Sequence, residues 1–417
     1  MRTTLQTIFA RHFAEYAQTR PLHPREWRAG SAITDCFTAA LGGHVLTCPA
    51  GHGSHTQYHA CRHRSCPRCA ERPRHLWVEA ELQRLLPCAH FHAVFTLPHV
   101  FLPLWRCNRA RLNALLFDCA RQSLLQLCAD ERHLGATPGL LMALHTWGRD
   151  LALHPHVHCL VSAGGVDPEG RWRDSRPDYL VPVKALCALF RGKMLHALRL
   201  AIRRRHVDLP AGLDAAHWHA VISAQYRKHW NVELAERYGH GRGVALYLAR
   251  YVKGGPLPAD RPLHLGQHDV RFPYTDHRDG KSKVARFATH TFIDRVLSHA
   301  PPRAQHMVRH CGLYATAARA QHQRCMQHLA PSTPPILPPA AACHQRSLPQ
   351  RACPTCQAPM ERTLSLLPTH RFSEISRARV NPSATAAGST TRSSEQTTAA
   401  TDLPLRRRTL RRRSTLN

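Results

Sequence analysis

Histidine and apolar residues alternate in two segments of the chain, and this alternation is the pattern of a half-buried β-strand. In residues 153–161 a histidine occupies every second position, at His154, His156 and His158, before the run becomes apolar. Because a strand directs successive side chains to opposite faces, we expect the imidazoles on one face and the residues between them in a core. Residues 90–97 repeat the alternation and are followed by a proline.

Apolar residues repeat at helical spacing in two further segments, and a short apolar run between these segments predicts another strand. Residues 104–129 carry leucines at helical spacing, and residues 186–205 have a helical pattern that ends in a basic run. Residues 140–144 are a short apolar run that indicates a strand, and residues 164–165 are a Gly-Gly pair that we expect in a turn. The order of these elements predicts an α+β fold, with an antiparallel sheet and helices on one side of it.

The composition changes near residue 330. Residues 331–339 are rich in proline, and residues beyond 376 are mainly Ser, Thr, Ala and Arg. Such a segment buries too little apolar surface to fold, so we expect a disordered basic tail after about residue 370 that contacts DNA phosphates without reading their sequence. We divide the chain into an N-terminal module, a main domain, and a linker with a tail, at residues 1–85, 86–330 and 331–417.

The net charge narrows the class of partner. Lys and Arg number 57 against 27 Asp and Glu, and the formal charge of +30 at pH 7 favours a polyanion, by default nucleic acid. The sequence has neither an apolar run of the roughly 18 residues that span a bilayer nor a signal peptide pattern at its start. We therefore expect a cytoplasmic protein whose 16 Cys stay reduced.

Cysteines gather between residues 48 and 69 with the spacing of a zinc site. Cys66-Pro-Arg-Cys69 is a knuckle whose thiolates can hold one tetrahedral Zn²⁺, and further ligands stand upstream of it. A closed, cysteine-rich site of this kind is structural rather than catalytic. The expected ligands are Cys48, Cys61, Cys66 and Cys69, with His52 or His63 as substitutes.

The remaining cysteines are of two kinds. A second pair, Cys353-Pro-Thr-Cys356, follows Cys343 and His344 and has the form of a partial zinc ribbon, whose metal binding the pair alone leaves open. Many of the others stand singly and are expected as small buried apolar residues: Cys36, Cys88, Cys107, Cys119, Cys128, Cys159 and Cys187.

A tyrosine pair lies further along, in a segment of helical composition. Tyr247 and Tyr251 are four residues apart and would share a helix face near Arg250 and Lys253, and the pair alone also fits two core tyrosines. A phenol, with a pKa of about 10, attacks a phosphate only when a metal and cations draw charge from it. Strand histidines with a metal, and a helix with tyrosines and cations, are together what phosphodiester transfer through phosphotyrosine requires.

The sequence His156-Val157-His158 with a downstream Tyr-x-x-x-Tyr resembles the HUH endonuclease superfamily. Within it, the chain is similar to the rolling-circle insertion-sequence transposases of the IS91 group, which are of the two-tyrosine type. The likeness covers about residues 10–330. It rests on motifs in consistent order: the Ser-Cys-Pro-Arg-Cys knuckle and residues 90–98, 146–150, 247–251, 276–281 and 309–314.

The resemblance implies an HUH-type nuclease domain behind a zinc-binding module with structural Zn²⁺. His156 and His158 would hold a catalytic Mg²⁺ or Mn²⁺. Tyr247 and Tyr251 would cut one DNA strand at the end of the mobile element, leaving a 5′-phosphotyrosine and a free 3′-OH, and would rejoin it to a target strand without ATP. The implied setting is the bacterial cytoplasm, at the nucleoid.

The chain departs from the family pattern at its first cysteine pair. Gly51 holds the second position of that pair, and the adjacent His52 would replace the missing ligand. A third polar ligand for the catalytic metal is also usual in the family, and His90, His92 and His154 are the candidates for it here.

Basic residues near these motifs are the expected DNA contacts. Arg250 and Lys253 accompany the tyrosines, and Arg278, Lys281 and Lys283 belong to a polar turn of hairpin type. For that turn, an ordinary solvated loop fits the pattern equally well. The partner that the resemblance implies is DNA, chiefly single-stranded, at the ends of the protein's own element and at its target.

Two other classes of function fit parts of the sequence. A histidine-triad nucleotide hydrolase or transferase also has alternating histidines before apolar residues, but such proteins are generally far shorter and lack the cysteine segment. A non-enzymatic zinc DNA-binding protein accounts for the charge and the cysteines but leaves the histidines and tyrosines without a role. The substrate separates the enzymes, since a triad enzyme acts on nucleotides and a transposase on single-stranded DNA.

Overall fold

The computed structural model describes residues 3–235, 237–239, 243, 248, 254–276, 279–330 and 351–369. The strands are β1 (Gly43–Thr47), β2 (Ser54–Tyr58), β3 (His90–Thr96), β4 (Thr137–Trp147), β5 (Leu153–Val166), β6 (Trp172–Asp174), β7 (Val232–Leu234), β8 (His264–Leu265), β9 (Asp269–Thr275), β10 (Ser282–Ala288), β11 (Val308–Gly312) and β12 (Glu361–Leu366). The α-helices are α1 (Leu5–Gln18), α2 (Pro24–Asp35), α3 (Pro67–Arg84), α4 (Leu102–Cys107), α5 (Arg109–Cys128), α6 (Val183–Arg203), α7 (Ala215–Gln225), α9 (Thr289–Leu297) and α10 (Arg319–His328).

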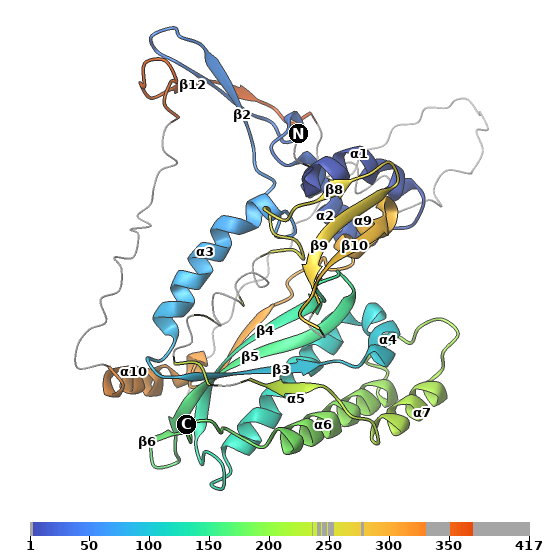
Figure 1. The fold of residues 1–417 in the computed structure, drawn as a ribbon, viewed down its shortest axis with the longest axis vertical. Coiled ribbons are helices and arrows are strands. Elements are labelled where there is room, and N and C mark those ends of the chain that lie inside the picture. The colour runs from blue at the N-terminus through green and yellow to red at the C-terminus, as the bar shows by residue number, and fades with distance from the viewer. Residues whose placement is uncertain are drawn as a thin grey trace, which may run out of the picture. The chain divides into compact units, whose positions relative to one another are not determined.

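The strands form three antiparallel sheets. The largest has six strands, in the order β11-β4-β5-β3-β7 with β6 beside β5, and we call it the central sheet. The other two have three strands each, in the orders β12-β1-β2 and β10-β9-β8. The mixed α+β class with antiparallel sheets is therefore as the sequence predicts (Figure 1).

A layer of helices covers one side of the central sheet. Figure 1 shows α5, α6 and α7 along this side, where they share a buried core with β3, β4 and β5. Phe95, Leu144 and Val157 from the strands meet Leu116 and Phe190 from the helices in this core. The predicted position of the helices, on one side of the sheet, follows from the period-two burial of apolar residues in the strands.

The helix predicted over residues 104–129 is interrupted once. Asn108 separates α4 from α5, and its side-chain amide donates to the carbonyl oxygens of Leu104 at 2.9 Å and Asp208 at 2.6 Å. An asparagine that bonds to the backbone in this way competes with the helical hydrogen bonds. The interruption lets α4 and α5 cover different parts of the core.

The Gly-Gly pair at 164–165 does not form a turn, and this expectation is wrong. Both glycines lie inside β5, where Gly164 pairs with Asp174 of β6. A Cβ atom on Gly164 would lie 2.3 Å from the ring of Trp172, and one on Gly165 would lie 2.6 Å from the carbonyl oxygen of Thr137. The glycines are required because neighbouring strands approach too closely for any side chain.

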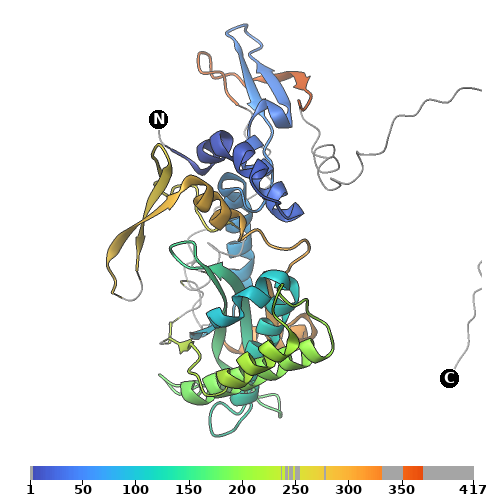
Figure 2. The ribbon, with the colours of Figure 1, turned by 90° about the vertical axis from the view of Figure 1, so that its right-hand side faces the viewer.

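The first two helices share a core with a segment from much later in the chain. Phe9 of α1 and Ile33 of α2 are buried in one cluster with Phe272 of β9 and Phe292 of α9. Figure 2 shows the β9–β10 hairpin beside α9 and α1. Cys66 belongs to the same cluster, so the N-terminal module is built partly from residues beyond 257.

The remaining sheet joins an early segment of the chain, β1 and β2, to the late strand β12. β12 pairs with β1, from Gly43 opposite Leu366 to Thr47 opposite Glu361, and β2 pairs with the other edge of β1. No helix in the described part of the chain is long and apolar enough to cross a membrane. The expected basic tail lies outside the described residues, as do Cys343 and His344.

Candidate active site and metal centres

Three histidines meet on the face of the central sheet opposite the helix layer. His145 of β4 lies opposite His156 of β5, and Ala143 lies opposite His158. Because residues two positions apart share a face, the rings of His145, His156 and His158 project together, with centroids 4.1 to 5.2 Å apart. Their ligand atoms lie within 4.8 Å of one another. We call this surface, together with His92 of β3, the histidine face.

The sequence predicts His156 and His158 as metal ligands but does not single out His145, which the structure groups with them. The signal was present, because His145 directly precedes the motif at 146–150 and directly follows the apolar run at 140–144 that predicts a strand. That strand is longer than predicted and runs to Trp147, which brings His145 onto the histidine face. The antiparallel register, which the sequence does not show, then places His145 against the histidine strand.

The three sequence candidates for a third ligand lie outside this cluster. His92 is adjacent to it, with its Nε2 atom 2.8 Å from Nδ1 of His158. The imidazole of His90 is hydrogen-bonded at 2.7 Å to the hydroxyl of Tyr314. The imidazole of His154 contacts that of His99, which precedes α4. His145 therefore completes the group of described histidines in place of these candidates.

Burial keeps two of the clustered imidazoles neutral. His145 is 2% exposed and His158 is 4% exposed. Loss of hydration, reinforced by the neighbouring histidines, holds the pKa of both side chains well below the usual range. Burial also lowers the pKa of His92 to about 4, against the opposing charge of Glu233. Neutral imidazole is the form that binds a metal, because its unprotonated nitrogen carries a lone pair.

Hydrogen bonds orient two of the rings. Nδ1 of His156 donates to the carbonyl oxygen of His154, which leaves the lone pair on Nε2. Nδ1 of His158 faces Nε2 of His92, and donation from His158 places the lone pair of its own ring on Nε2. The set of donors thus fits a divalent metal ion.

The histidine face lines a cavity of about 620 Å³. Arg149 and Arg261 also line it, and Glu233 is the acidic residue among the described residues of its wall. Backbone carbonyls hold both guanidinium groups, since Arg149 donates to Thr275 at 3.3 Å and Arg261 to Pro273 at 2.9 Å. Two arginines beside metal-binding imidazoles form a suitable environment for a phosphate group.

Most of the tyrosine segment lies outside the described residues: Tyr247, Arg250, Tyr251 and Lys253. Leu248, which directly follows the first tyrosine in the sequence, is described and fully buried. It belongs to a cluster with Leu141, Ala143 and Leu160, which lie on the same strand faces as the clustered histidines. The chain at residue 248 is therefore anchored on the side of the central sheet that carries the histidine face.

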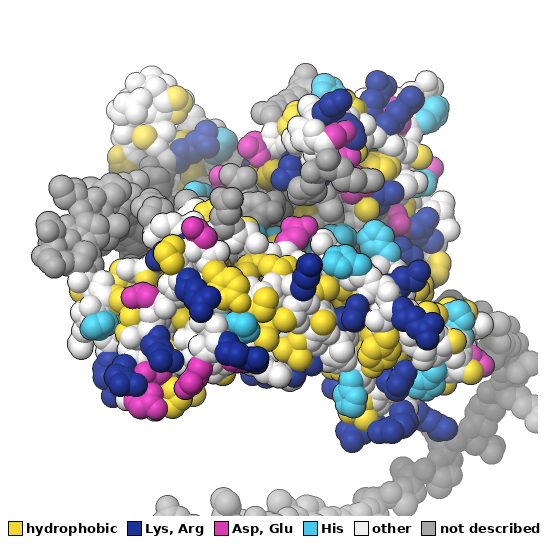
Figure 3. All heavy atoms as spheres, turned by 60° about the horizontal axis from the view of Figure 1, so that its bottom comes forward, with side chains coloured by type: hydrophobic (Ala, Val, Ile, Leu, Met, Phe, Trp, Pro, Cys, Tyr) yellow, Lys and Arg dark blue, Asp and Glu magenta, His cyan; other side chains and the backbone are white. Residues whose placement is uncertain are grey.

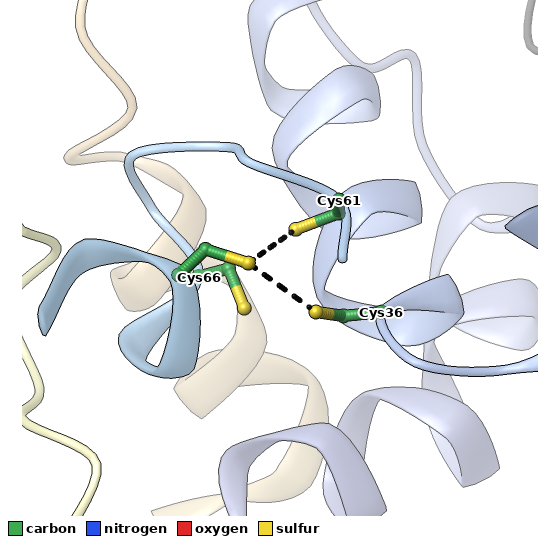
Figure 4. A group of neighbouring side chains, drawn as sticks. Cys36, Cys61 and Cys66 are labelled. Carbon is green, nitrogen blue, oxygen red and sulfur yellow. Dashed lines mark hydrogen bonds between the residues drawn. The ribbon is translucent and has the colours of Figure 1, made fainter. Parts of the chain in front are cut away.

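Four thiols meet where α2 ends and α3 begins. Cys36 follows the last residue of α2, Cys61 lies in a loop, and Cys66 and Cys69 belong to the start of α3. Figure 4 shows Cys36, Cys61 and Cys66 with their sulfur atoms directed toward one another. Sγ of Cys69 lies 3.5 Å from that of Cys36 and 3.6 Å from that of Cys61. All four sulfur atoms are within 4.8 Å of one another, a spacing that suits tetrahedral Zn²⁺.

The expected zinc set is corrected at one position. Cys36 is not one of the isolated apolar cysteines that the sequence predicts, because the fold carries the end of α2 to the knuckle of Cys66 and Cys69. Cys48 is not brought to that knuckle and instead follows β1, where its sulfur lies 3.6 Å from Nδ1 of His52. The other substitute, His63, accepts a hydrogen bond from a backbone N–H at 3.1 Å.

The polar turn is a hairpin, as predicted, and it links β9 to β10. Asp276 donates its backbone N–H to the carbonyl of Lys281 at 2.9 Å. The ammonium group of Lys283 lies 2.7 Å from Asp276 and 2.9 Å from Asp279, so carboxylates of the turn itself offset its charge. Arg278 lies outside the described residues.

Elsewhere the excess of basic residues is visible on the surface. Figure 3 shows Lys and Arg side chains spread over the face that it presents, with acidic groups only scattered among them. A surface of this kind attracts the phosphate backbone of nucleic acid without reading its sequence.

Comparison with known proteins assigns the family. A family model described as "Transposase zinc-binding domain" matches residues 8–97, and one described as "Putative transposase" matches residues 139–322. The chain is 34% identical over 335 residues to "Putative transposase y4qJ" of Sinorhizobium fredii, across 78% of this chain and 84% of that protein. It is 31% identical over 294 residues to "Transposase for insertion sequence element IS801" of Pseudomonas savastanoi pv. phaseolicola, across 69% of this chain and 70% of that protein. The chain belongs to the IS91-like transposases. No solved structure matches it.

Membership of the transposases confirms the sequence-based recognition and makes DNA the partner. The zinc-binding match contains Cys36, Cys61, Cys66 and Cys69, and the transposase match contains the three clustered histidines and both tyrosines. The histidine-triad and non-enzymatic interpretations are therefore set aside. In this IS91-like transposase, the zinc-binding domain and the histidine face are separate candidate metal centres.

Proposed function

We propose that this transposase cuts and rejoins single DNA strands through a 5′-phosphotyrosine, next to a divalent metal held by His145, His156 and His158. Tyr247 and Tyr251 are the nucleophiles of this proposal. The observation that carries it is the group of three buried imidazoles in a cavity that also contains two arginines. An all-imidazole set favours Mn²⁺ over Mg²⁺, because Mg²⁺ prefers oxygen ligands.

The metal, when bound, would polarise a phosphate oxygen as a Lewis acid. Arg149 and Arg261 would bind the remaining charge of the phosphate that enters the cavity. The imidazoles of His145 and His158 remain neutral in this role, since burial depresses the pKa of both. Glu233 is the acidic residue of the described wall. With a divalent metal bound, the positive charges of the metal and the two arginines would exceed its single negative charge, so the cavity would be predominantly cationic.

The proposed cutting and rejoining steps need no external energy source. A tyrosine oxygen attacks the phosphorus, the bond to the 3′ oxygen breaks, and that oxygen takes up the proton that the phenol loses. The 5′ phosphate then remains on the tyrosine until the 3′-OH of another strand attacks it and restores the phenol. Each step exchanges one phosphoester bond for another, so no ATP is consumed. A second tyrosine allows a second cut while the first strand is still held.

Leu248 supports the assignment of the tyrosines. Its burial in the cluster with Leu141, Ala143 and Leu160 attaches the chain next to Tyr247 to the histidine side of the central sheet. For the zinc-binding domain, we propose that Cys36, Cys61, Cys66 and Cys69 hold structural Zn²⁺, because closed sets of four thiolates lack an open position for a substrate.

Covalent capture tests the proposal. The full-length protein is incubated with Mn²⁺ and single-stranded oligonucleotides that cover both strands at each end of the element carrying its gene. We expect a protein–DNA adduct that resists denaturation and that mass spectrometry assigns to Tyr247 or Tyr251. H145A and the double variant Y247F/Y251F should form no adduct, because one lacks a metal ligand and the other both nucleophiles.

Matched controls separate chemistry from folding. Tyr226 is exposed at the end of α7 and stacks on Arg199, and His219 lies on the same helix. Y226F and H219A should therefore retain full adduct formation. An adduct that persists in Y247F/Y251F would exclude these tyrosines, and an adduct that persists in H145A would exclude the metal assignment.

A further inference from the structure

A second group of metal-binding side chains lies at one end of the β12-β1-β2 sheet. It combines Cys48 and His52, which follow β1, with Cys353 and Cys356, which precede β12. We propose that these four residues hold a second structural Zn²⁺. This metal would fasten residues 351–369 to the N-terminal zinc-binding domain. The first pair lies within the segment matched as a zinc-binding domain, whereas the second lies beyond both matched segments.

The geometry of the group is that of a tetrahedral site. Sγ of Cys48 lies 3.6 Å from Nδ1 of His52 and 3.6 Å from Sγ of Cys356. All four ligand atoms are within 4.8 Å of one another. The edges of a Zn²⁺ tetrahedron have similar lengths, since the bonds to sulfur are about 2.3 Å and those to nitrogen about 2.0 Å.

Two tight turns present these ligands. Each begins with a Cys-Pro dipeptide, at Cys48-Pro49 and Cys353-Pro354. In the first turn the backbone N–H of Gly51 donates to the carbonyl of Cys48 at 3.0 Å, and in the second the N–H of Gln357 donates to the carbonyl of Cys353 at 2.9 Å. Gly51, at φ 78°, adopts the left-handed conformation that such a turn needs. His52, directly after this glycine, brings its Nδ1 atom to the sulfur of Cys48.

Backbone N–H groups prepare one of the thiols for a metal. The N–H groups of Cys356 and Thr355 point at the sulfur of Cys353, an arrangement that stabilises negative charge on that atom. Thiolate is the form that binds Zn²⁺. The donor set of three sulfur atoms and one imidazole nitrogen selects Zn²⁺ over the harder ions Mg²⁺ and Mn²⁺.

The sheet has little else to stabilise it. Its buried cluster consists of Leu46, Cys48, Cys353 and Met360, and β12 is exposed at all but its last position. A three-stranded sheet with so small a core is marginal in water, and structural metals are the common remedy in units of this size. Two of the four core residues are themselves ligands, so the metal would form the centre of the core.

The zinc content of the full-length protein tests the proposal. We expect C353S/C356S to contain one zinc equivalent per chain less than the wild type, by elemental mass spectrometry. C36S/C66S should also lose one equivalent, and the combination of all four changes should lose two. Cys107 is exposed in α4 and belongs to neither group, so C107S is the matched control and should lose none. An unchanged zinc content in C353S/C356S would overturn the proposal.

A second variant keeps the site and changes only its ligand type. H52C replaces the imidazole by a fourth thiolate, so zinc content should be retained. After Co²⁺ replaces zinc, the visible absorption of H52C should shift to longer wavelength than in the wild type, because thiolate is a weaker-field ligand than imidazole. Loss of folding cannot produce such a shift, and an unchanged spectrum would exclude His52 as a ligand.

The link between residues 351–369 and the N-terminal zinc-binding domain is tested separately. A protease recognition sequence introduced between residues 331 and 350 allows the chain to be cut after folding. With zinc present, the fragment that begins near residue 351 should remain bound to the rest of the protein during gel filtration. It should separate after chelation and in C353S/C356S. Separation in the presence of zinc would contradict the link.

Discussion

Nε2 of His92 lies 2.8 Å from Nδ1 of His158, although the two residues are on different strands. Their rings are nearly parallel, at an interplanar angle of 12°. The contact engages Nδ1 of His158 and so fixes the direction of Nε2, the nitrogen that would hold the proposed metal. His92 is therefore a positioning residue for the proposed metal site rather than one of its ligands.

The first prediction concerns this contact. H92A should lower the affinity for Mn²⁺ by about 10- to 100-fold, because removing an outer hydrogen-bond partner of a metal ligand has this effect. Adduct formation should recover at high Mn²⁺, unlike in H145A, and H92N should recover part of the affinity. Titration of Mn²⁺ by paramagnetic resonance gives the affinities. An unchanged affinity in H92A would assign His92 a purely packing role.

The second prediction concerns the anchor of the tyrosine segment. L248A removes a fully buried side chain and should cost about 2–5 kcal/mol in the packing of that segment. Adduct formation should slow, whereas Mn²⁺ affinity and salt-sensitive DNA binding should stay as in the wild type. L248M should restore the rate, because methionine conserves the volume. Equal rates in L248A and the wild type would show that the anchor does not position the nucleophile.

The third prediction concerns the thiols at the start of α3. Cys66 shares a core with Phe9, Phe272 and Phe292, so removal of zinc should loosen late residues as well as early ones. After chelation, hydrogen exchange should quicken in α1 and α2 and also in β9, β10 and α9, with the central sheet still protected. C36S should reproduce the pattern. Faster exchange confined to residues 36–69 would show that the shared core does not respond cooperatively.

The fourth prediction concerns acid. His299 is buried, with Nε2 donating to the carbonyl of Leu151 at 3.1 Å and Nδ1 at 3.2 Å from the hydroxyl of Thr146. Burial, aided by the charges of Arg109 and Arg295 and opposed by the bond to Leu151, lowers its pKa to about 3.

The unfolded chain therefore binds a proton that the folded chain excludes, once the pH is below the ordinary histidine pKa of about 6.5. Stability should fall as the pH decreases from that value, by up to about 1.4 kcal/mol per pH unit from this group. H299Q keeps both hydrogen bonds and should flatten the dependence, as urea unfolding at pH 7.5 and pH 5 would measure. An identical pH dependence in H299Q would remove His299 from the acid response.

Local sequence patterns predicted the elements that carry the site better than the site itself. The alternation at 153–161 predicted β5, and with it the shared face of His156 and His158, because a strand has a fixed period. The same reasoning stopped short of His145, whose place depends on the length of β4 and on its register with β5. Propensity and period say little about either. The turn predicted at residues 164–165 failed for a related reason, since close contact between strands also requires glycine.

For the cysteines too, the sequence identified some of the proposed ligands and the fold supplied the others. Spacing alone identified the knuckle of Cys66 and Cys69, because both of its ligands come from one turn of chain. The partners of the knuckle and of Cys48 come from elsewhere, Cys36 through the packing of α2 and Cys353 through the pairing of β12 with β1. The sequence by itself determined the strand and helix periods, the charge, the transposase motifs and the types of ligand. Only the tertiary structure decided which ligands share a site, because that depends on contacts between residues far apart in the chain.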